Sequence, residues 1–79
     1  MEPNAIDTAT QTLYYCEDAR LPALARQAIA YGKGWQWEEV ERILDRMYGL
    51  AGVENPASGY EFHTGTHPVW KIIDILAAS

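Results

Sequence analysis

The sequence predicts an all-α fold, a small bundle of about four helices with one long irregular loop before the last helix. Through most of the chain, apolar residues recur at positions i, i+3, i+4 and i+7, the spacing of one helix face. Proline and glycine interrupt these stripes at intervals typical of helix boundaries. The 79 residues suffice for one domain, expected over 1–79.

The first two helices are expected over 8–19 and 22–31. Asp7 or Thr8 can supply the N-cap oxygen of the first, and Pro22 suits the first turn of the second. The segment Gly32-Lys33-Gly34 predicts the end of the second helix, because glycine readily takes the left-handed conformation that follows many helices. The apolar face of the first helix consists of Ile6, Ala9, Leu13 and Cys16. That of the second consists of Leu21, Leu24, Ala25 and Ala28, widened by Ile29.

The third and last helices are expected over 37–48 and 68–77, on either side of a loop over about 52–67. Glu38 and Glu39 in the first turn of the third helix, and Arg46 in its last, complement the helix dipole; Gly49 or Gly52 ends it. Thr66 or His67 caps the last helix and Pro68 opens it. The two apolar stripes consist of Val40, Ile43, Leu44 and Met47, and of Val69, Ile72, Ile73 and Leu76. A loop this long in so small a domain is often functional, although Tyr60 and Phe62 can simply hold it against the bundle.

The charge balance favours a basic partner. Eleven acidic residues against six basic ones give a net charge of −5. A negative net charge opposes direct binding to nucleic acid and to anionic membranes, and it steers association toward basic protein surfaces. The alternative is that this charge only keeps the protein soluble. No secretory signal and no bilayer-length apolar stretch is found. With Cys16 as its one cysteine, the chain has no internal disulfide, and a cytoplasmic location is expected.

Three kinds of chemical site are weakly supported. His63 and His67 have a spacing that suits metal binding on a helix, but Gly65 and Pro68 place them in a loop. Cys16 lies beside two acidic residues, which disfavour a reactive thiolate. The second and third helices suggest a helix-turn-helix, yet the third begins with acidic residues where DNA recognition needs basic ones. We therefore predict no catalytic residue, metal or cofactor; a metal-binding or helix-turn-helix-like regulator is the weakest alternative.

The aromatic residues predict a binding surface instead. Three tryptophans and five tyrosines are more than so small a core can bury, and exposed aromatic residues often anchor protein interfaces. One tryptophan of Trp35-Gln36-Trp37 can fold onto the third helix, which leaves the other beside acidic residues; alternatively both fold into the bundle. Tyr14, Tyr15, Tyr31 and Tyr48 are further candidates for exposure. The predicted partner-binding residues are Trp35, Trp37, Glu38, Glu39, Glu41 and Asp45.

In its size, acidity and lack of motifs, the chain resembles small phage-encoded inhibitors, of which anti-CRISPR proteins are the best-known group. The resemblance implies a non-enzymatic protein, encoded by a phage or mobile element, that acts in the host cytoplasm. Its partner would be a basic surface on a CRISPR effector subunit or another nucleic-acid-handling protein. The main alternative is a structural or adaptor homodimer, whose seam on the last helix would use Trp70 and Ile75.

Overall fold

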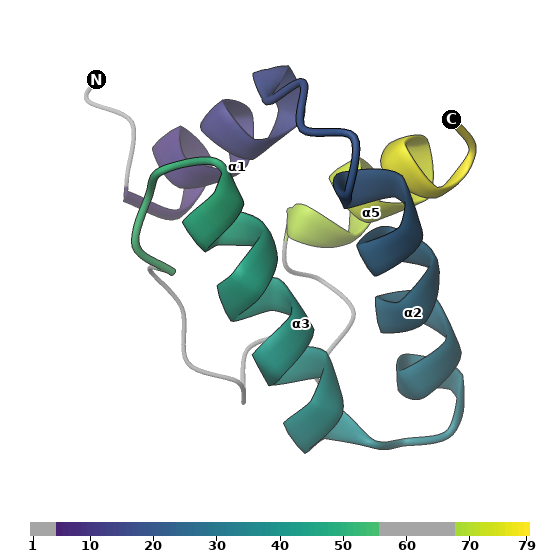
Figure 1. Ribbon diagram of the computed structural model, residues 1–79. Helices are drawn as coiled ribbons and strands as arrows, with labels where there is room; N and C mark the ends of the chain where they lie inside the picture. The colour runs from purple at the N-terminus through teal and green to yellow at the C-terminus, as the bar shows by residue number, and fades with distance from the viewer. Residues whose placement is uncertain (1–4, 56–67) are drawn as a thin grey trace.

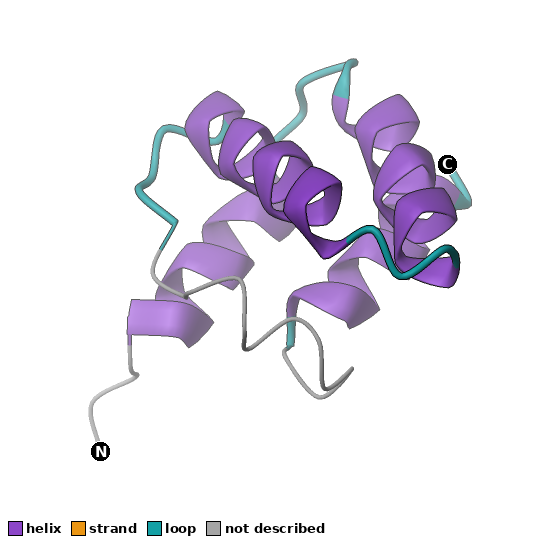
Figure 2. Ribbon diagram, turned by 90° about the horizontal axis from the view of Figure 1, so that it is seen from below, coloured by secondary structure: helices purple, strands orange, loops and turns teal. Residues whose placement is uncertain are grey.

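The described part of the protein is entirely helical apart from its connections. The computed structural model describes the backbone of residues 5–55 and 68–79, and the side chains of 8–55 and 68–79. These ranges contain four helices and no strand, which confirms the predicted all-α fold (Figures 1 and 2). The helices are α1 (Ala5–Tyr15), α2 (Leu21–Lys33), α3 (Trp37–Leu50) and α5 (Val69–Ala77).

Helix α2 lies at the centre of the packing. It contacts both α3 and α5, and α1 closes the other end of the core by contacting α5 and α3. The connection between α2 and α3 lies at the bottom of the view in Figure 1, and α1 crosses the top. The α2–α3 connection and the α1–α5 contact are thus at opposite ends of the molecule.

The core consists of the stripes that the helical spacing predicts. Every predicted apolar position of α2 and α3 is buried, except Ile29, which is half-buried. In α5, Val69 and Ile73 are buried, and Ile72 and Leu76 are half-buried at the edge. Burial of these side chains is the main source of stability in a helical bundle, at roughly 1.5–3 kcal/mol for each large aliphatic group.

Tyr48 belongs to this core, and its predicted candidacy for exposure is wrong. Its ring is fully buried, and its hydroxyl lies 3.2 Å from the Thr10 hydroxyl of α1. Tyr48 follows Leu44 by four positions and therefore extends the buried stripe of α3. Burial raises the pKa of the Tyr48 hydroxyl, and the hydrogen bond with Thr10 partly offsets that effect.

Helix α1 begins and ends earlier than predicted. It starts at Ala5, so neither Asp7 nor Thr8 occupies the N-cap, and it ends at Tyr15 rather than Ala19. The carboxylate of Asp18 accepts hydrogen bonds from the Arg20 backbone N–H at 2.9 Å and from the Arg20 guanidinium. Such local side-chain bonds compete with a continuing helix. The side-chain bonds to Arg20 also lower the pKa of Asp18 to about 2.

The other helix boundaries shift by up to two residues. Helix α3 runs through Gly49 to Leu50, so Arg46 does not lie in its last turn as predicted. Pro68 occupies the N-cap of α5 rather than its first helical position, and Thr66 and His67 lie outside the described residues. At the other end of α5, the Arg26 guanidinium of α2 donates to the Ala77 carbonyl at 3.3 Å. Of the predicted loop, the described residues 52–55 are non-helical.

Candidate docking site

The predicted binding residues lie where α2 turns into α3, and the turn itself differs from the prediction. Helix α2 continues through Gly32 to Lys33, and Gly34 is not left-handed. The left-handed residue is Trp35, with φ of 60°. Its N–H donates to the Gly32 carbonyl at 3.1 Å, and the Gln36 N–H donates to the Tyr31 carbonyl at 3.0 Å. This pair of bonds is a Schellman motif, in which the left-handed position is usually glycine.

The end of α3 provides an internal comparison. There the Gly52 N–H donates to the Gly49 carbonyl at 3.1 Å, and the Val53 N–H donates to the Tyr48 carbonyl at 3.0 Å. Gly52 occupies the left-handed position with φ of 80°. The same motif therefore ends both helices, once with glycine and once with tryptophan. A left-handed backbone costs a non-glycine residue roughly 1–2 kcal/mol.

The Trp35 side chain gains little packing in return for this strain. It is 79% exposed, the largest exposed fraction among the large hydrophobic residues of the described chain. Its ring meets that of Trp37 edge-on, with centroids 6.2 Å apart and planes at 78°. Trp37 is half-buried against the core. Of the two alternatives, the structure thus has one indole outside and one inside, but the residue before the N-cap, Trp35, is the exposed one and Trp37 is the one that packs inward.

Gly32 explains how Trp37 reaches the core. A Cβ at Gly32 would lie 3.7 Å from the Trp37 ring and 3.5 Å from the ring of Trp70, so both indoles rest close to this glycine. Trp70 is accordingly half-buried, and it approaches the last turn of α2. Ile75, five positions later on α5, is 51% exposed. Because five residues turn a helix by about 140°, these two predicted seam residues lie on different sides of α5.

Carboxylates complete the site beside the two tryptophans. A shallow surface hollow is lined by Trp35, Gln36, Trp37, Glu38 and Glu39. The Glu39 carboxylate accepts a hydrogen bond from the Arg42 guanidinium at 2.7 Å, rather than Arg42 pairing with Glu38 or Asp45 as their spacing suggests. Glu38 is exposed and forms no ion pair within the described residues.

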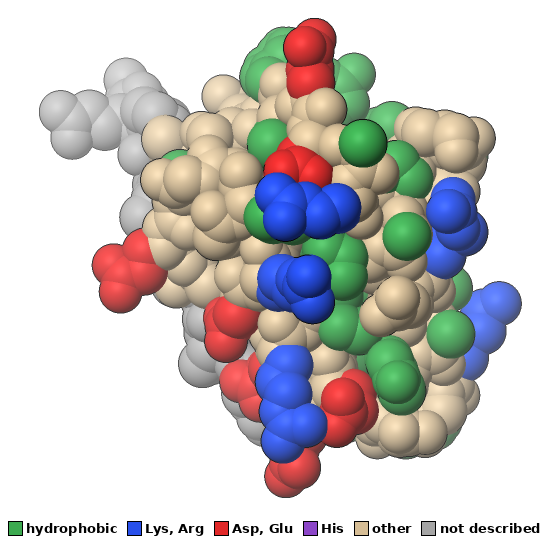
Figure 3. Space-filling model, viewed as in Figure 1, with side chains coloured by type: hydrophobic (Ala, Val, Ile, Leu, Met, Phe, Trp, Pro, Cys, Tyr) green, Lys and Arg blue, Asp and Glu red, His purple; other side chains and the backbone are tan. Residues whose placement is uncertain are grey.

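Two predicted site residues lie outside this hollow. Glu41 does not line it. Asp45 is seven residues beyond Glu38, about 10 Å along the helix, and accepts a hydrogen bond from the Asn55 amide at 2.6 Å. Figure 3 shows acidic and basic side chains interspersed over the face that α3 occupies in Figure 1. Of the four predicted carboxylates, Glu38 and Glu39 line the hollow and Glu41 and Asp45 do not. Gln36 is the one residue lining the hollow that the sequence did not predict.

A second exposed apolar surface, which the sequence did not predict as a unit, lies between α1 and α5. Tyr14 and Tyr15 are 44% and 75% exposed, and their rings meet edge-on at 5.0 Å. With Thr10, Gln11, Ile72 and Ile75 they line a shallow groove that contains no charged side chain. Ile72 and Ile75 are three positions apart on α5 and line this groove together. Ile75 therefore lies on the side of α5 next to α1, away from Trp70.

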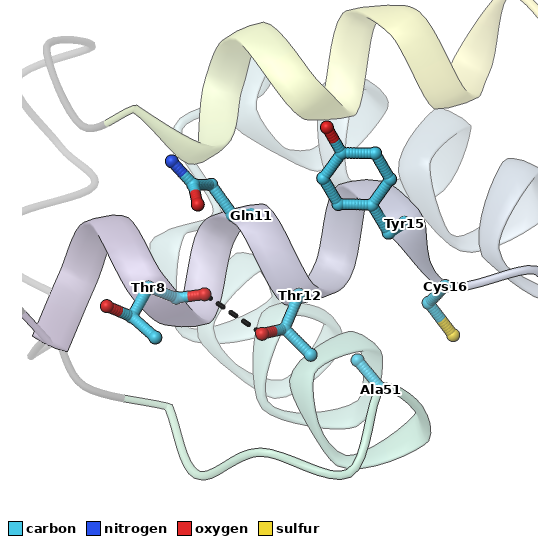
Figure 4. Close-up of a pocket in the computed structure, with 6 residues that line it drawn as sticks. All are labelled: Thr8, Gln11, Thr12, Tyr15, Cys16 and Ala51. Carbon is cyan, nitrogen blue, oxygen red and sulfur yellow. Dashed lines mark hydrogen bonds between the residues drawn. The ribbon is translucent and has the colours of Figure 1, made fainter.

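A third hollow is lined by uncharged residues and offers little chemistry. Thr8, Gln11, Thr12 and Tyr15 of α1 line it together with Cys16, which directly follows α1, and Ala51, which directly follows α3 (Figure 4). The Thr12 hydroxyl donates to the Thr8 carbonyl at 3.0 Å. Cys16 is half-buried, with its sulfur 3.8 Å from the Leu50 carbonyl. None of the six lining residues carries a formal charge that would activate the thiol or bind an ion.

The described residues also bear on metal binding and on membrane insertion. In 5–55 and 68–79, no three acidic, histidine or cysteine side chains are grouped to hold a metal ion; His63 and His67 lie outside these ranges. No helix of the described chain is long and apolar enough to cross a membrane. Comparison with protein-family models, with curated proteins and with solved structures finds no match.

Proposed function

We propose that the chain is a non-enzymatic inhibitor that binds a basic surface of a nucleic-acid-handling protein, such as a CRISPR effector subunit. One observation carries this proposal: the Trp35 ring is 79% exposed at a left-handed backbone position. A residue that costs stability and gains little packing points to a role outside the fold. Exposed tryptophans are also the side chains most often found to dominate protein interfaces.

The charges around Trp35 support the choice of a basic partner. Glu38 and Glu39 line the hollow, and the whole chain has a net charge of −5. Negative potential at a docking site speeds encounter with a positive surface and disfavours acidic partners. Basic surfaces of this kind are what proteins use to hold phosphate backbones. The resemblance to phage-encoded inhibitors supports the same class of partner.

The proposal is tested by competition with a polyanion. The immobilised chain is incubated with a nuclease-treated bacterial lysate, and bound proteins are eluted either with heparin or with sodium chloride at equal ionic strength. If carboxylates occupy a phosphate-binding surface, heparin should release nucleic-acid-binding proteins where salt alone does not. Glu38→Lys with Glu39→Lys should abolish their capture. Retention of the same proteins by this variant, or equal elution by salt, would contradict the proposal.

A homodimer is the second candidate, and the groove between α1 and α5 favours it. Its lining is uncharged, so two copies can meet there without opposing like charges despite the net charge of −5. Exposed Tyr15 and Ile75 would be buried by such a contact. Sedimentation at high concentration should give a dimer mass for the wild type and a monomer mass for Ile75→Glu. A wild-type monomer under these conditions removes this candidate.

A further inference from the structure

The hollow at the start of α3 has the components of a cation-binding corner. We infer that Trp35, Trp37 and Glu38 together receive an arginine side chain of the partner protein. This inference rests on the proposed function and specifies the chemistry by which the same site recognises a basic surface. The site thus offers aromatic faces and a carboxylate to one guanidinium group.

The geometry of the two indoles supplies the aromatic part. The ring planes stand at 78° with centroids 6.2 Å apart, so the two rings form adjoining walls rather than a closed stack. The hollow beside them is lined by both rings. A cation over an indole face is attracted by its negative potential, and tryptophan binds cations more strongly in this way than tyrosine or phenylalanine does. Because Trp35 is 79% exposed, a partner side chain can reach it.

The carboxylates determine where the charge of the ligand would lie. The Arg42 guanidinium already forms an ion pair with the Glu39 carboxylate at 2.7 Å, whereas Glu38 forms no ion pair within the described residues. Glu38 is therefore the carboxylate open to an incoming cation. Lys33, at the end of α2, is exposed and does not line the hollow.

An arginine meets these conditions better than a lysine. The guanidinium is planar, so it can lie flat on an indole while its N–H groups donate in a fork to one carboxylate. An ammonium group is a more strongly hydrated point charge and gains less from the flat ring. Arginine is also frequent on surfaces that bind phosphates, which agrees with the partner class proposed above.

Capped peptides that carry arginine, lysine or citrulline at identical positions test this assignment on the full chain. The indole N–H resonances of the three tryptophans are followed by NMR as each peptide is added. The arginine peptide should shift Trp35 and Trp37 and leave Trp70 in place, while neutral citrulline should shift none of them. Trp35→Ala or Glu38→Gln should weaken arginine binding about two- to fivefold, the size of one exposed cation–π contact or surface ion pair.

Matched variants separate this site from general charge attraction. Glu41→Gln removes the same charge from the same helix outside the hollow, and Tyr15→Ala removes an exposed ring at the other end of the molecule. Both should leave arginine binding unchanged. Equal binding of the lysine peptide, or equal losses in these controls, would overturn the assignment. The proposed function fails separately: it falls if heparin-sensitive capture is absent, even when the arginine peptide binds.

Discussion

At the scale of single residues, Trp35 and Gly52 occupy equivalent positions in two copies of one motif. Removing the side chain at Trp35 and adding one at Gly52 tests whether the left-handed backbone at Trp35 is strained. Trp35→Gly should raise the free energy of unfolding by up to about 1 kcal/mol, because relief of the left-handed strain exceeds the loss of one edge-on ring contact. Gly52→Ala should lower it by about 1 kcal/mol, since an added Cβ meets nothing within 4 Å and only the backbone cost remains.

Urea denaturation of the two variants measures both effects. Trp35→Ala serves as the control, because it removes the ring but keeps a side chain at the left-handed position. It should be no more stable than the wild type. If Trp35→Gly is instead markedly less stable than the wild type, the ring contributes packing, and the case for a role outside the fold is lost.

A second prediction at this scale concerns Tyr48 and the pH dependence of the free energy of unfolding. Its pKa is raised by burial, so the folded state holds the hydroxyl proton more tightly than the unfolded state, where the pKa is about 10. The resulting stability is fully present below pH 10 and declines as pH rises through the raised pKa. Tyr48→Phe should cost about 0.5–1.5 kcal/mol at neutral pH through the lost hydrogen bond with Thr10.

The effect of the raised pKa and the effect of the lost hydrogen bond are separated by measuring the free energy of unfolding of wild type and Tyr48→Phe from pH 7 to 11. The difference between the two proteins should be constant up to about pH 10 and should shrink above it. A difference that stays constant to the highest pH would mean that the hydroxyl does not ionise more readily in the unfolded chain.

At the scale of elements, α3 contains a glycine that its fold does not need. Gly49 lies inside the helix, and a Cβ there would meet no atom within 4 Å. Gly49→Ala should therefore stabilise the protein by about 1 kcal/mol, the difference in helix propensity, measured as a raised midpoint in thermal unfolding. Gly32→Ala is the matched variant on α2, where the new methyl would touch the rings of Trp37 and Trp70 at ordinary distances. A loss of stability in Gly49→Ala would contradict the helical conformation at that position.

At the scale of the whole molecule, the helical core could be predicted and the turns could not. The stripe of Val40, Ile43, Leu44 and Met47 follows directly from helical spacing, which does not depend on the rest of the chain. The end of α2 depends on tertiary contacts: Gly32 stays helical where two indoles pack beside it, and Trp35 takes the conformation expected of glycine. Residue type alone therefore pointed to the wrong position.

Only the part of the candidate site that depends on local sequence could be predicted. Trp35, Trp37, Glu38 and Glu39 are neighbours in sequence, and the start of α3 brings them into one hollow. Asp45 shares their helix but lies about two turns away, bonded to Asn55. The surface of Tyr14, Tyr15 and Ile75 could not be predicted, because it requires knowing that α1 packs beside α5.

We infer that Trp35 serves binding rather than folding, and one comparison of two proteins tests this most directly. Wild type and Trp35→Gly are immobilised in parallel and incubated with the same nuclease-treated bacterial lysate, and their unfolding midpoints are measured on the same preparations. We predict that Trp35→Gly is at least as stable as the wild type but loses heparin-sensitive capture of nucleic-acid-binding proteins. Capture of the same proteins in the same amounts by Trp35→Gly would contradict the claim.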